Sequence, residues 1–142
     1  MIAFITARLD EVEHDAQAAI GTSVWAKQTG CWVHRNVEIS DHTSLIVFAV
    51  AQDEARTQVA DLTAAWEGPE RAVHIARHDP ARVLAEVAAR RQMVANLRTA
   101  IDHTWQFGEE ARDVVTSLAV RMLQQLAALD ADHRDYDPAW AL

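Results

Sequence analysis

The second half of the chain is dominated by a long helical periodicity, which begins at Pro80 and continues almost to the end. Apolar residues recur there at intervals of three and four, the spacing that gathers side chains on one face of a helix. Gly108, preceded by Gln106 and Phe107, interrupts the pattern. We therefore predict two long helices joined as an antiparallel hairpin. The two apolar stripes are Val83, Val87, Val94, Leu97, Ile101 and Trp105, followed by Val115, Leu118, Met122, Leu126 and Leu129.

The first half of the chain predicts a helix followed by a small sheet. Between Val24 and Thr63, β-branched and aromatic residues gather in short runs separated by turn-like segments, which favours an antiparallel meander of three to four strands. Residues 45–50 are apolar on both faces and should form the central strand. Residues 56–63 fit a helix or a strand, and we favour a strand paired with 45–50. The helix is predicted over residues 3–20 from the stripe of Ile2, Ile5, Leu9, Val12, Ala16 and Ala19.

These elements together predict an α+β fold. A break at Gly68 and Pro69 precedes a short helix that should end near Arg77, and residues 130–142 form an extended C-terminal tail whose last aromatic residue docks back. A chain of 142 residues, of which 50% are hydrophobic, is large enough for one core. We predict a single domain over residues 1–142, with an N-terminal helix, a small antiparallel sheet, a short helix, and a long C-terminal helical hairpin packed on one face.

Charge and composition limit the classes of function. The formal net charge is −8, from 13 basic and 21 acidic residues, which disfavours nucleic acid as a partner. The single cysteine, Cys31, cannot form an internal disulfide or a thiolate metal site. The N-terminal apolar run is interrupted at Arg8 and lacks the basic segment and cleavage site of a signal peptide. Because no run approaches the roughly 18 apolar residues of a membrane span, we expect a cytoplasmic protein without membrane contact.

The segment HIARHDPARVL carries the strongest local signals in the chain. Asp79 followed by Pro80 is typical of a helix start, because the carboxylate accepts free amide hydrogens and proline fits the first helical position. Asp79 also places negative charge at the positive end of the helix dipole. These two residues therefore form a structural helix cap.

Two further hypotheses concern the polar residues around this cap. His74 and His78 lie four residues apart and could ligate a divalent metal, with an oxygen from Asp79. Either His133 with Asp132, or His34 with His42, would complete the set. The zinc-protease version of this spacing has a glutamate after the first histidine, whereas Ile75 stands here. Alternatively, basic side chains near the helix start could bind an anion. The ligand or metal candidates are therefore His74, Arg77, His78, Asp79, Arg82 and His133, and no cofactor is expected outside these alternatives.

Three segments resemble one known family. FITARLDEVEHDAQAA, AVHIARHDPARVLAEVAARRQMV and ADHRDYDPAW are similar to successive signatures of the DUF6221 proteins, a family of unknown function from high-GC Gram-positive bacteria and their phages. Members typically carry ADHP before the tyrosine, whereas Arg134 follows His133 here. The resemblance implies a small accessory protein of phage or prophage origin. It supplies no catalytic residues.

The function that we expect from these observations is non-enzymatic. Long amphipathic helices and strong negative charge favour a protein that binds a protein partner through acidic and helical surfaces, as an inhibitor or a DNA mimic. The same helical faces could serve self-association into a homo-oligomer. The alternative is a protein that binds a small ligand, an anion or a divalent metal, or a hydrolase, with its site at the HIARHDP segment.

Overall fold

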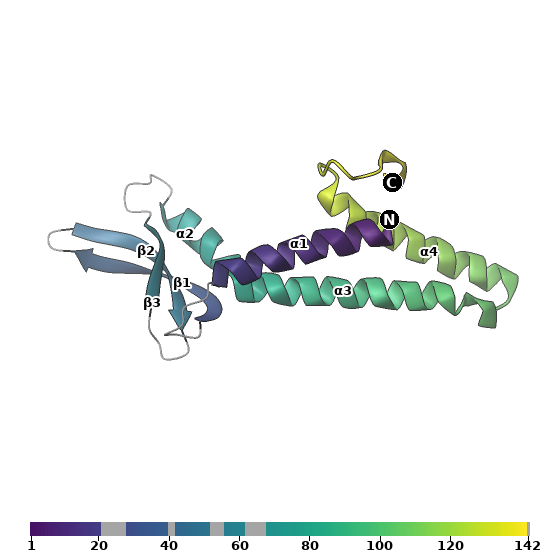
Figure 1. The fold of residues 1–142 in the computed structure, drawn as a ribbon, viewed down its shortest axis with the longest axis horizontal. Helices are drawn as coiled ribbons and strands as arrows, with labels where there is room; N and C mark the ends of the chain where they lie inside the picture. The colour runs from purple at the N-terminus through teal and green to yellow at the C-terminus, as the bar shows by residue number, and fades with distance from the viewer. Residues whose placement is uncertain (21–27, 40–41, 52–55, 62–67, 142) are drawn as a thin grey trace. The chain divides into compact units, whose positions relative to one another are not determined.

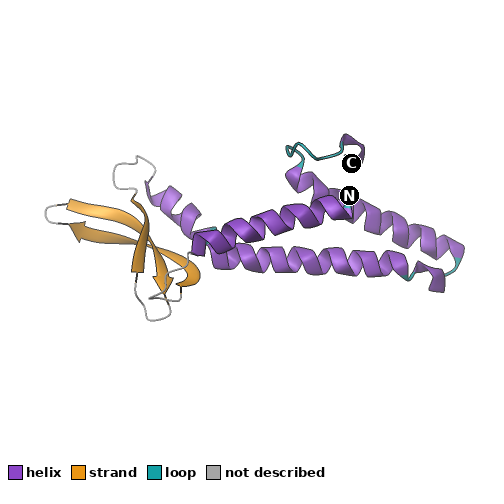
Figure 2. Ribbon diagram, viewed as in Figure 1, coloured by secondary structure: helices purple, strands orange, loops and turns teal. Residues whose placement is uncertain are grey.

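The structure, a computed structural model, has the element order of the predicted α+β fold (Figures 1 and 2). It describes residues 1–20, 28–39, 42–51, 56–61 and 68–141. The α+β class, the N-terminal helix, the small antiparallel sheet and the later helices are confirmed. The helices are α1 (Ile2–Ile20), α2 (Gly68–Arg77), α3 (Pro80–Asp102) and α4 (Glu109–Ala127), with short 3₁₀ turns η1 (Thr104–Gln106), η2 (Ala128–Asp130) and η3 (Pro138–Trp140), and the strands are β1 (Gln28–Ile39), β2 (His42–Ala51) and β3 (Arg56–Asp61).

The chain divides into two compact units. Residues 1–12 and 87–142 form one, here called the helical unit, and residues 13–86 form the other, here called the sheet unit. The single domain predicted over residues 1–142 stays a prediction.

The sheet unit contains three described strands in the order β1-β2-β3, all antiparallel. The strand prediction is confirmed for residues 56–61 by β3, whereas residues 62 and 63 lie outside the described residues. β2 is the central strand as predicted. Ile46 and Val47 are adjacent, so they point to opposite faces of the sheet. Both are buried, which shows that both faces are covered there. The predicted β run at Val24 and Trp25 lies outside the described residues.

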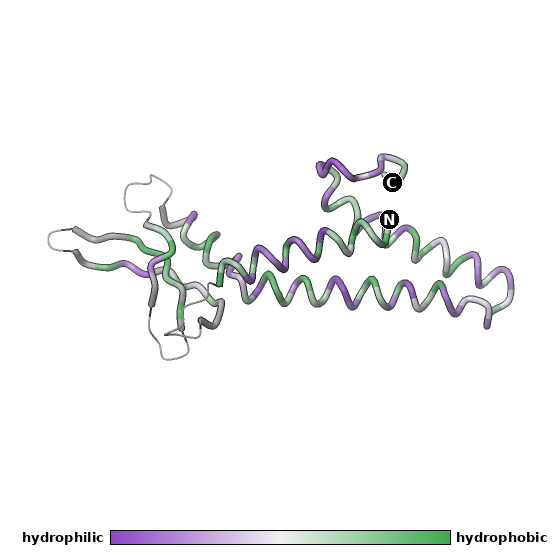
Figure 3. Tube along the Cα trace, viewed as in Figure 1, coloured by the Kyte–Doolittle hydropathy of each residue, from purple (hydrophilic) through white to green (hydrophobic). Residues whose placement is uncertain are grey.

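The helical unit is built around a core supplied by three helices. Leu123, only 2% exposed, lies on α4 between two buried alanines, Ala119 and Ala127. Small residues on this face allow neighbouring helices to approach closely. Figure 3 shows hydrophobic positions recurring along α3 and α4 at helical intervals. The remaining buried members of this cluster are Phe4, Ile5 and Leu9 of α1 and Val87, Val94 and Leu97 of α3.

The predicted apolar stripes are partly wrong. Trp105 is 69% exposed, and Leu118 and Leu129 are each 59% exposed, although all three were expected in the core. The buried face of α4 instead follows an alanine–leucine–alanine row at intervals of four, centred on Leu123. A stripe defined by large apolar residues omits alanines. The stripe therefore includes Leu118, which is exposed, and misses its neighbour Ala119, which is buried.

The C-terminal tail returns to the start of α1. The rings of Tyr136 and Trp140 lie 6.0 and 5.2 Å from the ring of Phe4, measured between centroids. Asp137 begins η3, because its side chain accepts a hydrogen bond from the backbone N–H of Ala139. The predicted docking of the last aromatic residue is therefore confirmed.

None of the helices in the described part of the chain is both long and apolar enough to cross a membrane.

Leu123→Ala should lower the free energy of unfolding by about 2 to 5 kcal/mol, because it opens a cavity in the helical core. Met93→Ala is the matched control, since Met93 lies on α3 and is 42% exposed; its effect should stay within about 0.5 kcal/mol. Urea denaturation followed by circular dichroism measures both. Equal losses in the two variants would show that α4 does not face the core through Leu123.

Candidate functional site

The two histidines of the HIARHDP segment lie together on the surface of α2. Their ring centroids are 4.5 Å apart with an interplanar angle of 50°, and both side chains are exposed. The spacing of four residues thus places them on one helix face, as a metal site would require. Among the described residues, however, no three histidine, cysteine, aspartate or glutamate side chains are grouped to hold a metal ion. The metal hypothesis has no supporting geometry in that part of the chain.

Asp79 and Pro80 form the junction between α2 and α3. The Oδ1 atom of Asp79 accepts a hydrogen bond of 2.7 Å from the backbone N–H of Arg82, which is the bond of a helix N-cap. Its Oδ2 atom accepts a longer bond, 3.4 Å, from the backbone N–H of Trp32 in β1. Pro80 is the first residue of α3 and is buried. One carboxylate therefore joins the start of α3 to the sheet.

The two arginines of the segment have different surroundings. The Nε atom of Arg82 donates to Glu86 at 3.1 Å, one turn along the same helix. Arg77 has no carboxylate within ion-pair distance among the residues that the structure describes, and it lines an open cavity of about 510 Å³. Arg77 is therefore the arginine of the segment that lines a cavity and has no ion-pair partner among the described residues.

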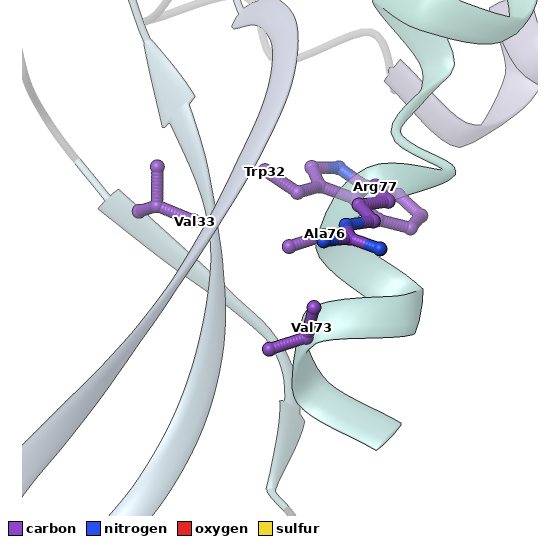
Figure 4. Close-up of a pocket in the computed structure, with 5 residues that line it drawn as sticks. All are labelled: Trp32, Val33, Val73, Ala76 and Arg77. Carbon is purple, nitrogen blue, oxygen red and sulfur yellow. The ribbon is translucent and has the colours of Figure 1, made fainter. Parts of the chain in front are cut away.

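The cavity lies between β1 and α2 (Figure 4). Its other lining residues are Trp32 and Val33 of the strand and Val73 and Ala76 of the helix. The indole nitrogen of Trp32 is buried and has no hydrogen-bond partner in the described part of the chain. A guanidinium and an apolar wall suit an organic anion better than they suit proton transfer, since arginine does not lose its proton in proteins.

His133, the sixth candidate, belongs to the helical unit and contacts Arg8 there. Arg8 is 9% exposed, and its Nη1 and Nη2 atoms donate to the two carboxylate oxygens of Glu11 at 2.6 and 2.8 Å. Nη1 also lies against Nε2 of His133, and the guanidinium carbon stands 5.7 Å from the centre of the Phe4 ring. Arg8 therefore connects α1 to the C-terminal tail, next to the ring contacts of Phe4 with Tyr136 and Trp140.

The Arg8 cluster was missed in the sequence, where Arg8 only interrupted an apolar run. The sequence does carry one signal, the arginine followed three residues later by Glu11, which is the spacing of a helical ion pair. Nothing local, however, connects Arg8 with His133, since 125 residues separate them.

A second surface is formed by the outward side of α4, here called the α4 outer face. Five residues line its shallow groove of about 390 Å³. Val114 is 62% exposed and Leu118 59%. The groove is bordered by one acidic and one basic side chain. The five residues are Asp113, Val114, Ser117, Leu118 and Arg121.

The fold and these surfaces define a small α+β protein whose helical unit exposes apolar side chains and whose sheet unit carries an open cavity. The chain belongs to the DUF6221 family, a family of unknown function whose model matches residues 1–142. The match confirms the resemblance of the three sequence segments. No curated protein and no solved structure matched the chain.

Asp79→Ala should lower the free energy of unfolding by about 1 kcal/mol, because the first turn of α3 loses its cap. Asp79→Asn keeps a side-chain oxygen for the N–H of Arg82 and should cost clearly less. Chemical denaturation of both variants beside the unsubstituted protein measures the difference. A loss that is the same for alanine and asparagine would contradict the capping role.

Proposed function

We propose that this chain is a non-enzymatic interaction protein, a cytoplasmic accessory protein of phage or prophage origin, which binds a protein partner through the α4 outer face. The observation that carries the proposal is the exposure of Val114 and Leu118, four residues apart on one helix. Single exposed apolar residues are normal in soluble proteins, but a contiguous apolar patch marks a binding surface.

The energy available at this face is substantial. Complete burial of a valine or leucine side chain contributes about 1.5 to 3 kcal/mol. Trp105 and Phe107, 69% and 49% exposed, lie at the turn that precedes α4. Aromatic residues are enriched in the centres of interfaces, so the turn could extend the apolar contact beyond the helix.

Charge favours a partner with a basic surface. The first turn of α4 carries Glu109 and Glu110, both exposed, and the chain as a whole has a net charge of −8. Complementary charge accelerates association and selects among partners. A basic site on a nucleic-acid enzyme meets this description, and the protein would then act as an inhibitor or a DNA mimic.

Affinity capture from a host lysate tests the proposal with three forms of the protein. A partner should be retained by the unsubstituted protein and lost with the double variant Val114→Glu and Leu118→Glu, because the apolar contact becomes charged. Val59→Glu is the matched control, since Val59 is 41% exposed but lies on β3. If all three forms retain the same proteins, or none retains any at low and moderate salt, the proposal fails.

A second candidate function rests on the cavity of the sheet unit. Arg77, the indole of Trp32 and the apolar walls fit a small organic anion, such as a carboxylate with a flat apolar body. This candidate retains the anion alternative at the HIARHDP segment and needs no catalytic group.

Benzoate at millimolar concentration should raise the melting temperature of the protein, with sodium chloride at matched ionic strength as the reference. Arg77→Ala should abolish the rise because the carboxylate loses its ion pair. Arg82→Ala should keep it, since the Arg82 side chain pairs with Glu86. A melting temperature that ignores benzoate, or a rise that persists in Arg77→Ala, would remove this candidate.

A further inference from the structure

We infer that the α4 outer face binds a second copy of this chain, with the two α4 helices antiparallel about a two-fold axis at Ser117. The inference rests on the proposed function for the choice of the face, but its occupant is a second copy of this chain and not a partner with a basic surface. In a two-fold dimer the two surfaces that meet are identical. Here, each copy contributes its α4 outer face.

The arrangement of residues about Ser117 is symmetric. Asp113 and Arg121 lie four residues before and after it, which places each about 6 Å along the helix axis and about 40° to one side. All three are exposed. The buried Ala119 and Leu123 lie on the other side of the helix, so the symmetric face points away from the core of the helical unit.

The charges on this face are complementary to themselves only in the antiparallel orientation. There, Asp113 of each copy lies opposite Arg121 of the other, and two identical ion pairs form. A parallel pair would place aspartate opposite aspartate and arginine opposite arginine. Within the described residues of one chain, neither Asp113 nor Arg121 has an ion-pair partner. The second copy supplies the partner that each lacks.

The shape of the face also fits a second helix. Ser117 is small and lies at the crossing point, where packed helices come within about 8 to 10 Å of each other. Val114 and Val120, 62% and 36% exposed, lie at equal distances before and after Ser117, so each would meet the other residue of the second copy. In this orientation, Val114 of each copy meets Val120 of the other, and the two ion pairs form slightly farther from Ser117 along the helix axis.

The ends of α4 support the same orientation. Trp105 precedes the helix and Leu129 follows it, and both are largely exposed. Antiparallel pairing brings the end with the tryptophan in one copy beside the end with the leucine in the other. Because a single pair of helices buries less surface than a standard stable interface, we expect a reversible dimer with a dissociation constant in the micromolar range.

Sedimentation equilibrium over micromolar to millimolar concentrations tests the inference by a charge exchange. Asp113→Arg and Arg121→Asp should each weaken the dimer by about tenfold or more, because each replaces two ion pairs with two like-charge contacts. The double variant should restore the unsubstituted affinity. Arg112→Asp is the matched control, since it makes the same charge change on α4 away from the outer face and should leave the affinity unchanged.

Two results would overturn the inference: an unsubstituted protein that stays monomeric at millimolar concentration, or single variants that behave like Arg112→Asp. These failures are separate from failure of the proposed function. A monomer whose partner is still lost on substitution of Val114 and Leu118 would leave the proposed function standing and remove the second copy as occupant. Conversely, recovery of the dimer in the double variant supports the inference whatever the lysate shows.

Discussion

The packing of α4 through its alanine–leucine–alanine row determines the rest of the helical unit. Leu123 occupies the centre of that row, with Ala119 and Ala127 one turn to either side. The two alanines allow neighbouring helices to approach closely, and Met122 and Leu126 of the same helix pack against the core beside Leu123. The rotation of α4 is then fixed, and so are the residues that it turns outward.

The α4 outer face follows directly from that rotation. Leu118 comes immediately before Ala119, yet about 100° of rotation separates neighbouring residues on a helix, so burial of one leaves the other exposed. Val114 and Leu118 therefore point to solvent, whereas Leu123 and the two alanines are buried. This exposure of large apolar residues is the physical basis for the proposal that α4 binds a partner. The acidic first turn and Arg121 give the face a direction along the helix axis as well as an apolar centre.

Sequence patterns predicted the elements better than they predicted which faces are buried. The helical hairpin, its joint at Gly108 and strand β3 followed from periodicity and turn residues, because these signals are local. The core of α4 did not, since alanine gives little signal in a stripe of large residues. For the candidate site, too, the local features were predicted and the contacts between distant residues were not. Spacing placed His74 and His78 on one face, but only the fold shows the cavity at Arg77 and the contact of His133 with Arg8, both of which depend on residues distant in sequence.

Disulfide trapping at Ser117 tests the central claim about the α4 outer face most directly. In a Cys31→Ser background, Ser117→Cys places the thiol on the two-fold axis, where helices about 9 Å apart bring Cα atoms within disulfide range. Glu109→Cys is the control, since antiparallel pairing holds the two copies of residue 109 about 24 Å apart. We predict that mild oxidation yields a covalent dimer for Ser117→Cys and none for Glu109→Cys. Equal cross-linking at both positions, or none at Ser117, would contradict the account.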